Sequence, residues 1–176
     1  VYLFESYSVL SNFIIISSIF LIFSSIKDTI KLFKNKDFNF SRIVSHTAFG
    51  FLVLFIGLNY NFSLEKDFNL KVGETKKFDN YSIKFKDLNL KKFKNYKAVI
   101  GEFKILNLRN NSEQSLKPEI RIYENPSTLT YEASIRTGLL KDYYITMSNI
   151  DRSDYYNIKF QKKPFMLWIW ISVIII

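Results

Sequence analysis

The sequence predicts a membrane protein in which α-helical transmembrane spans flank an inserted periplasmic all-β domain, an antiparallel sandwich or barrel. Apolar residues gather in residues 8–26, 43–58 and 164–176, as expected of helices in lipid. Residues 65–163 are instead polar and charged, with apolar residues alternating at a period of two, as expected of strands. Aromatic residues make up 18% of the chain, which is rich for a soluble protein.

The first predicted element is a transmembrane helix within residues 1–26. Residues 8–26 carry no charged side chain and are rich in Ile, Phe and Leu. At about 1.5 Å per residue this run is just long enough to cross a bilayer core of about 30 Å. The loop that follows, residues 27–42, is short and basic. Short loops beside spans obey the positive-inside rule, so we expect this loop in the cytoplasm.

The second predicted element is a transmembrane helix over residues 43–64, which runs outward from the cytoplasm. No charged side chain lies between Arg42 and Glu65. The helix carries His46, the one histidine of the chain. Because an ionisable group within a span is costly, a functional role is the first hypothesis for this imidazole.

The residues that follow His46 suggest what that role could be. Gly50 lies four residues on, and Val53 and Gly57 continue the same helix face. A planar ring could lie in the flat cleft beside these glycines, so one interpretation is that His46 ligates haem iron and this face contacts the haem. Alternatively, His46 hydrogen-bonds to a neighbouring helix or relays protons, and the glycines allow close packing. One histidine supplies one axial ligand, so a partner ligand would lie outside the chain.

The third predicted element is the β-domain over residues 65–163. Turn signals such as Gly73, Pro118 and Gly138 separate its β-rich segments. About seven short strands at this spacing fit a small antiparallel sandwich or barrel. The segments are residues 68–72, 81–85, 99–108, 120–123, 131–135, 143–147 and 155–160.

Residues 164–176 are the predicted start of a further, truncated transmembrane helix. The run is apolar but too short to span a bilayer. Trp168 and Trp170 are typical of a membrane interface. The chain begins at Val1 rather than Met and stops within this run, so we expect a fragment of a longer protein.

Composition and motifs argue against several classes of function. The net charge is +9, but both signs are interspersed in the β-domain, which is typical of a solvated surface and not of a nucleic-acid footprint. Residues 91–97 mix lysines with aromatic rings, as single-stranded nucleic-acid grooves do, yet a charged hairpin or loop is the favoured interpretation. Cysteine is absent, His46 has no carboxylate nearby and the glycines are scattered. We therefore expect no catalytic residue in this chain.

Several motifs resemble one known family. From about residue 41 onward the chain is similar to the C-terminal part of CcmF, the haem lyase subunit of the bacterial cytochrome c maturation system, and to the related NrfE proteins. The motifs are Ser-His-Thr-Ala-Phe-Gly at 45–50, Asn-Tyr at 95–96, Pro-Glu-Ile-Arg-Ile-Tyr at 118–123, Thr-Tyr-Glu-Ala-Ser-Ile at 130–135, Asp-Tyr-Tyr at 142–144 and Lys-Pro-Phe-Met-Leu-Trp-Ile-Trp at 163–170.

The resemblance implies a role in cytochrome c biogenesis. The full-length protein would be a multi-pass haem lyase of the bacterial inner membrane that takes haem from a haem chaperone and attaches it to apocytochrome c. Other subunits of the lyase complex and membrane lipid would be its neighbours, and His46 would be one axial ligand of a membrane haem b. The family's tryptophan-rich haem-binding segment and second haem b ligand are not among these residues, so the chain alone is expected to be inactive. The alternative is a non-enzymatic, membrane-anchored β-domain that serves as an assembly or scaffold subunit.

Overall fold

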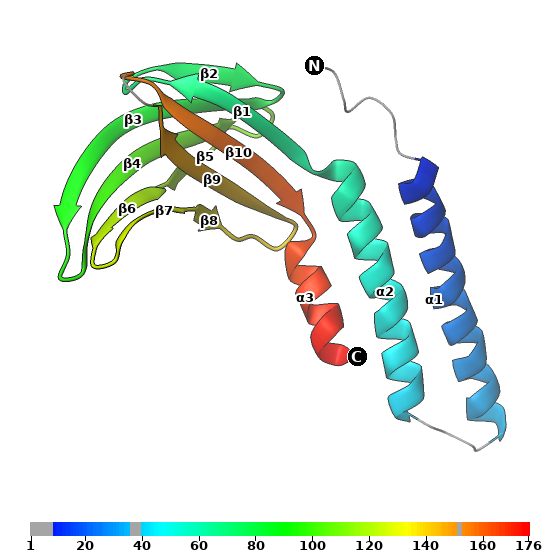
Figure 1. The fold of residues 1–176 in the computed structure, drawn as a ribbon. Coiled ribbons are helices and arrows are strands. Elements are labelled where there is room, and N and C mark those ends of the chain that lie inside the picture. The colour runs from blue at the N-terminus through cyan, green and yellow to red at the C-terminus, as the bar shows by residue number, and fades with distance from the viewer. Residues whose placement is uncertain (1–8, 36–39, 151–152) are drawn as a thin grey trace. The chain divides into compact units, whose positions relative to one another are not determined.

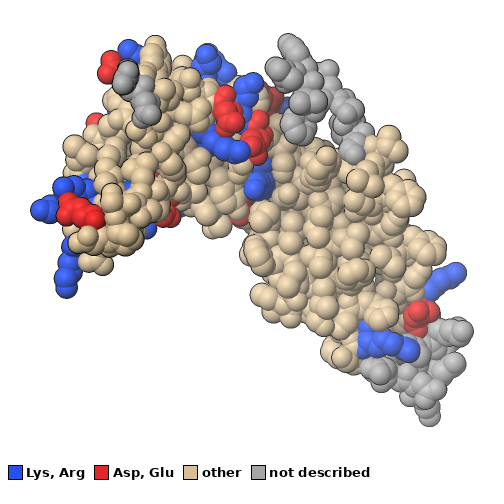
Figure 2. Space-filling model, in the orientation of Figure 1, with Lys and Arg blue, Asp and Glu red and all other residues tan. Residues whose placement is uncertain are grey.

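The structure, a computed structural model, describes residues 9–35, 40–150 and 153–176. The chain divides into two compact units. The helical unit contains three helices and the segment Thr137–Asp142, and the β-unit contains most of the strands. Figure 1 draws both units. On the face shown in Figure 2, charged side chains are dense over the β-unit and sparse over the helices.

The helical unit is built from α1 (Val9–Asn35), α2 (Phe40–Phe62) and α3 (Met166–Ile175). Two stretches, Val9–Ile30 and Phe40–Phe62, are long and apolar enough to cross a membrane, by length and composition. α1 continues to Asn35, so residues 27–35 of the expected loop are helical. That segment contains neither Gly nor Pro, and Lys continues a helix readily. Residues 36–39 of the expected loop lie outside the described part of the chain.

Two glycines allow α1 and α2 to approach closely. A Cβ atom built on Gly50 would lie 2.8 Å from Cγ1 of Ile22. One built on Gly57 would lie 2.9 Å from Cγ1 of Ile15. Both distances are far below the separation of about 3.5–4.0 Å that two carbon atoms prefer. The two helices therefore pack with glycine against isoleucine, a small-residue contact of the kind that brings membrane helices together.

The contact between α2 and α3 is aromatic. The ring of Phe55 stacks on those of Phe165 and Trp168, at centroid distances of 5.7 and 5.8 Å. Nδ2 of Asn59 donates a hydrogen bond to the carbonyl of Pro164, at 2.5 Å. Trp168 and Phe165 thus belong to the packed part of the helical unit, where they hold the beginning of α3 against α2.

The β-unit is a sandwich of two sheets whose strands pair antiparallel (Figure 1). The first sheet has the order β1-β10-β9-β8, and the second has the order β2-β3-β4-β6-β7 with β5 also paired to β4. The bounds are β1 (Leu64–Leu70), β2 (Thr75–Phe78), β3 (Tyr81–Lys92), β4 (Tyr96–Asn107), β5 (Ser112–Leu116), β6 (Glu119–Glu124), β7 (Ser127–Glu132), β8 (Ser134–Arg136), β9 (Lys141–Asn149) and β10 (Tyr156–Pro164).

Side chains from both sheets form one core. Phe85 and Phe103 are fully buried and stack with their ring centroids 4.3 Å apart. Tyr81 of the second sheet meets Tyr143 of the first, with 3.4 Å between their hydroxyl oxygens, and the ring of Phe160 packs against Tyr81. Burial, and next the hydrogen bond to Tyr143, raise the pKa of the Tyr81 hydroxyl. A core shared by two antiparallel sheets confirms the predicted fold class.

Ten strands are described, where the sequence predicted about seven. β2 and β5 were not predicted, because their sequences, Thr-Lys-Lys-Phe and Ser-Glu-Gln-Ser-Leu, are short and polar. Each pairs with a single neighbour, and a strand at an edge buries too little for a clear alternation. The predicted strand over residues 131–135 divides at Ala133 between β7 and β8, which belong to different sheets.

The core predicts that two leucines contribute very differently to the free energy of unfolding. Leu116 is 2% exposed and Leu90 is 79% exposed. Leu116→Ala is expected to lower the free energy of unfolding by about 2–5 kcal/mol, because it leaves a cavity in a packed core. Leu90→Ala should change it by less than about 0.5 kcal/mol. Urea unfolding of the chain in detergent, followed by far-ultraviolet circular dichroism, measures both, and equal losses would contradict the assigned core.

The helix contact predicts that Gly57→Leu separates α1 from α2. Ser11 and Asn61 hydrogen-bond through their side chains across this contact, and the chain has no cysteine. A disulfide between Cys introduced at both positions therefore reports helix pairing in membranes. Overpacking should lower the yield of that disulfide roughly tenfold, whereas Ile56→Leu, an exposed neighbour on α2, should leave it unchanged. An undiminished yield in the Gly57→Leu variant would show that the glycine is not required.

Candidate functional site

The candidate site is the face of α2 that carries His46. His46, Phe49, Val53, Ile56 and Tyr60 recur at spacings of three and four residues, so they lie along one side of the helix. Val53 is half-buried and the other four are exposed. This set, the His46 face, places an imidazole at one end of an apolar and aromatic strip. It is the surface of α2 on which a planar apolar ligand would meet the histidine.

The two glycines predicted to contact haem are covered by α1. Ile22 takes the space in front of Gly50, and Ile15 takes the space in front of Gly57. The structure therefore differs from the expected flat cleft beside these glycines, because side chains of the neighbouring helix fill it. Helix packing accounts for both glycines. The surface left open beside His46 is the strip that begins with Phe49 and includes the predicted Val53.

His46 itself has no partner among the described residues. It makes no hydrogen bond or ion pair there, although its neighbour Ser45 donates a hydrogen bond to the carbonyl of Ile176, at 3.0 Å. The described ranges also contain no group of three or more His, Cys, Asp or Glu side chains that could hold a metal ion. An exposed imidazole on an apolar strip does fit one axial ligand of a haem. The fit needs a second ligand from another helix.

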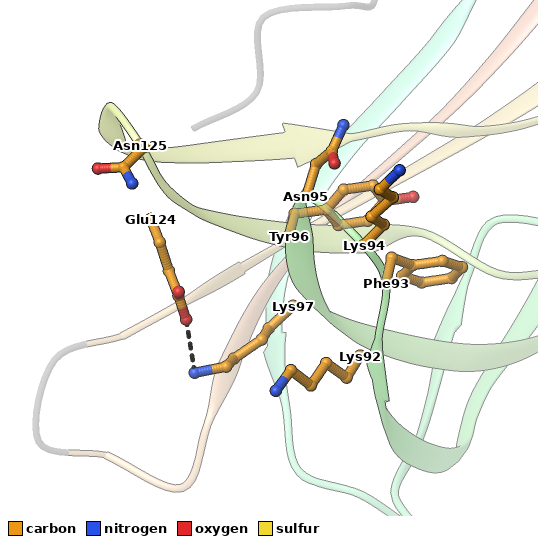
Figure 3. A pocket seen from close by; sticks show the side chains of 8 residues that line it. All are labelled: Lys92, Phe93, Lys94, Asn95, Tyr96, Lys97, Glu124 and Asn125. Atoms are coloured by element: carbon orange, nitrogen blue, oxygen red, sulfur yellow. Dashed lines mark ion pairs between the residues drawn. The ribbon is translucent and has the colours of Figure 1, made fainter.

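A second candidate site is a cleft of about 270 Å³ at the tip of the β3–β4 hairpin. Residues 92–97, the segment in which lysines alternate with aromatic rings, line it together with Glu124 and Asn125 (Figure 3). The segment forms the charged hairpin that the sequence favoured, since Lys92 ends β3 and Tyr96 begins β4.

Four of the eight residues that line this cleft pair with one another. Phe93 stacks on Tyr96, with 4.7 Å between ring centroids, and the guanidinium of Arg121 lies 5.0 Å from the Tyr96 ring. Nζ of Lys97 lies 2.8 Å from Oε1 of Glu124 (Figure 3). That hydrogen bond raises the pKa of Lys97 and lowers the pKa of Glu124. The two rings are stacked on each other and Lys97 is ion-paired with Glu124, so these four side chains already have partners within the cleft. This cleft is therefore the weaker candidate.

The turn between β8 and β9 has a feature that the sequence analysis does not predict. Gly138 marks it as a turn, but its two leucines, Leu139 and Leu140, have no predicted role. In the structure this turn belongs to the helical unit, and the indole of Trp168 donates a hydrogen bond to it. The available signal was a pair of leucines where turns normally place Gly, Asn, Asp or Ser.

Several named proteins are similar in sequence to most of this chain. A protein named cytochrome c-type biogenesis protein CcmF from Haemophilus influenzae is 30% identical over 131 residues, 74% of this chain and 20% of that protein. Proteins of the same name from Escherichia coli and Pseudomonas aeruginosa are 23% and 25% identical, and each match covers 73% of this chain and 20% of theirs. The chain spans about a fifth of the length of these relatives.

The fold agrees with that similarity. A solved structure named cytochrome c heme lyase CcmF aligns with a TM-score of 0.58 and 16% identity, over 76% of this chain and 22% of that one. At this identity the likeness concerns the fold. The family described as CcmF C-terminal beta-sandwich matches residues 61–164, which include every strand from β1 to β10. The chain therefore belongs to the CcmF family, and its β-unit is the C-terminal β-sandwich of that family.

Proposed function

We propose that this chain is the C-terminal part of a membrane protein of cytochrome c biogenesis, and that His46 is one axial ligand of a haem b. The observation that carries the proposal is the exposed imidazole of His46 on an otherwise apolar face of α2, with no hydrogen bond or ion pair to any residue that the structure describes. The names of the relatives supply the context, since they are cytochrome c-type biogenesis proteins. The second axial ligand comes from a helix outside this chain.

Ligation gives the imidazole a partner that residues 9–35, 40–150 and 153–176 do not supply. A polar ring nitrogen in lipid without a hydrogen bond is costly, and a bond to iron removes that cost. Ligation requires the neutral ring. Phe49, Val53 and Ile56 continue the strip, so they would lie against the macrocycle and exclude water. Haem bound here supplies one-electron chemistry.

The proposed arrangement in the membrane follows the charge of the chain. Residues 27–42, from the polar end of α1 to the beginning of α2, carry five basic and two acidic side chains, which favours the cytoplasm for that segment. α2 then leads outward, the β-sandwich within residues 65–163 faces the periplasm, and residues 164–176 return to the bilayer of the inner membrane. The full-length protein is proposed to be a haem lyase that works with a haem chaperone, apocytochrome c and other subunits of a membrane complex.

The second candidate function is a non-enzymatic assembly or scaffold subunit. In that case His46 packs or hydrogen-bonds to another helix, and position 46 tolerates replacement. The packing of Gly50 and Gly57 against α1 fits either function. The lack of any hydrogen bond from His46 to the described residues favours ligation over a packing role within this chain.

Replacement of the histidine separates the two functions. His46→Ala in the full-length protein, purified from membranes, is expected to lower haem b affinity by more than about tenfold, because an iron ligand is worth at least as much as an outer-shell partner. The low-spin absorption spectrum of the reduced protein measures the haem retained. Added imidazole should restore the spectrum, since it supplies the missing nitrogen ligand.

Thr47→Ala is the matched control, because it changes the neighbouring residue of α2 and keeps the imidazole. It should retain haem at the level of the unmodified protein. Unchanged haem content in the His46→Ala variant would overturn the ligand assignment and leave the scaffold function as the better one.

A further inference from the structure

We propose that the β8–β9 turn, residues 137–140, is a membrane-interface anchor that inserts the side chains of Leu139 and Leu140 into the lipid headgroup region beside α3. The inference rests on the membrane arrangement given above as the proposed function. It concerns residues to which neither the family resemblance nor the haem site gives a role. The occupant of this surface is the lipid bilayer.

The first observation is the exposure of two consecutive leucines at the tip of a turn. Leu139 is 64% exposed and Leu140 is 60% exposed. Single exposed apolar residues are common on protein surfaces, and this observation by itself would carry little. Turn tips in water, however, are normally built from Gly, Asn, Asp and Ser.

The second observation is that the backbone of this pair is satisfied from within the protein. Nε1 of Trp168 donates a hydrogen bond to the carbonyl of Leu139, at 2.8 Å. The backbone N–H of Phe165 donates one to the carbonyl of Leu140, at 2.9 Å. A turn in water can leave such carbonyls to the solvent, whereas lipid offers no donor, so a segment that enters it needs internal partners. The two leucines expose apolar side chains while their carbonyls are both paired.

The shape of the turn is fixed by its own residues. The backbone N–H of Gly138 donates to Oδ1 of Asp142, at 3.0 Å, and Asp142 is buried. A Cβ atom on Gly138 would lie 2.8 Å from the carbonyl oxygen of Lys141, so a glycine is needed for this close approach. The carboxylate is thus buried, whereas the side chains of the two leucines are exposed.

The third observation sets the depth of the turn. Both donors belong to the beginning of α3, since Phe165 is its N-cap residue and Trp168 lies in its first turn. Tryptophan prefers the membrane interface, where its ring meets lipid and its N–H finds a polar partner. Here that partner is the turn itself. A turn bonded to Trp168 lies at the level where α3 enters the bilayer, and its leucines meet the headgroup region.

The test places a fluorescent probe on the turn. Leu139→Cys and Leu140→Cys, each labelled with NBD, are made in the full-length protein in liposomes that contain lipids with a nitroxide near the headgroup or, in a second set, along the acyl chain. Both changes keep the backbone carbonyls, so the hydrogen bonds remain. Ile174→Cys on α3 is the lipid reference, and Asn110→Cys in the polar β4–β5 turn is the water reference. The unmodified protein, labelled in parallel, corrects for cysteines outside this chain.

The anchor predicts that nitroxide lipids quench both turn probes at least twofold more than the Asn110 probe, and that aqueous iodide quenches them at least twofold less. Iodide quenching equal to that at Asn110 would overturn it, because the turn would then lie in water. Protection from both quenchers would also overturn it, because protein would then cover the turn. If the Ile174 probe escapes nitroxide quenching, the membrane arrangement itself is wrong. If it is quenched and the turn probes are not, the anchor alone is wrong.

Discussion

The approach of α1 to α2 at Gly50 and Gly57 is the contact on which the helical unit depends. It determines which sides of α2 are covered. Isoleucines of α1 occupy the side of the two glycines, and the aromatic contact of Phe55 holds α3. The side that remains open carries His46 and the strip that follows it. Helix packing thus covers other sides of α2, and the side on which haem is proposed to bind stays exposed.

The β-unit shows which strands can be predicted from apolar residues that alternate with a period of two. Buried residues such as Ile83, Phe85 and Phe103 follow that period closely, because each strand has one face in a core shared by two sheets. The fold class could therefore be predicted. β2 and β5 could not, since short edge strands bury little and their polar sequences carry no alternation. The end of α1 was also hidden, because hydropathy marks the apolar part of a helix and the helix continues beyond it.

At the candidate site, sequence could single out His46 but could not say what its glycines do. A glycine indicates that something comes close, and only the fold reveals whether that is a ligand or a neighbouring helix. Here Ile15 and Ile22 come close. The pair Leu139 and Leu140 is an unusual choice of turn residues that the sequence does show. Their hydrogen bonds could not be predicted, because the donors lie more than twenty positions later in the chain and no local pattern encodes a contact of that range.

The pairing of β1 with β10 places the two ends of the sandwich next to each other. Leu64 is the register partner of Lys162, so the chain enters and leaves the sandwich at adjacent points, about 5 Å apart as in any antiparallel pair. One of these points directly follows α2 and the other directly precedes α3. Domains whose two ends meet can be inserted into a loop without disturbing their host. The sandwich therefore has the layout of a domain inserted into the connection between α2 and α3. Substitutions within such a domain can leave the packing of the two helices unchanged.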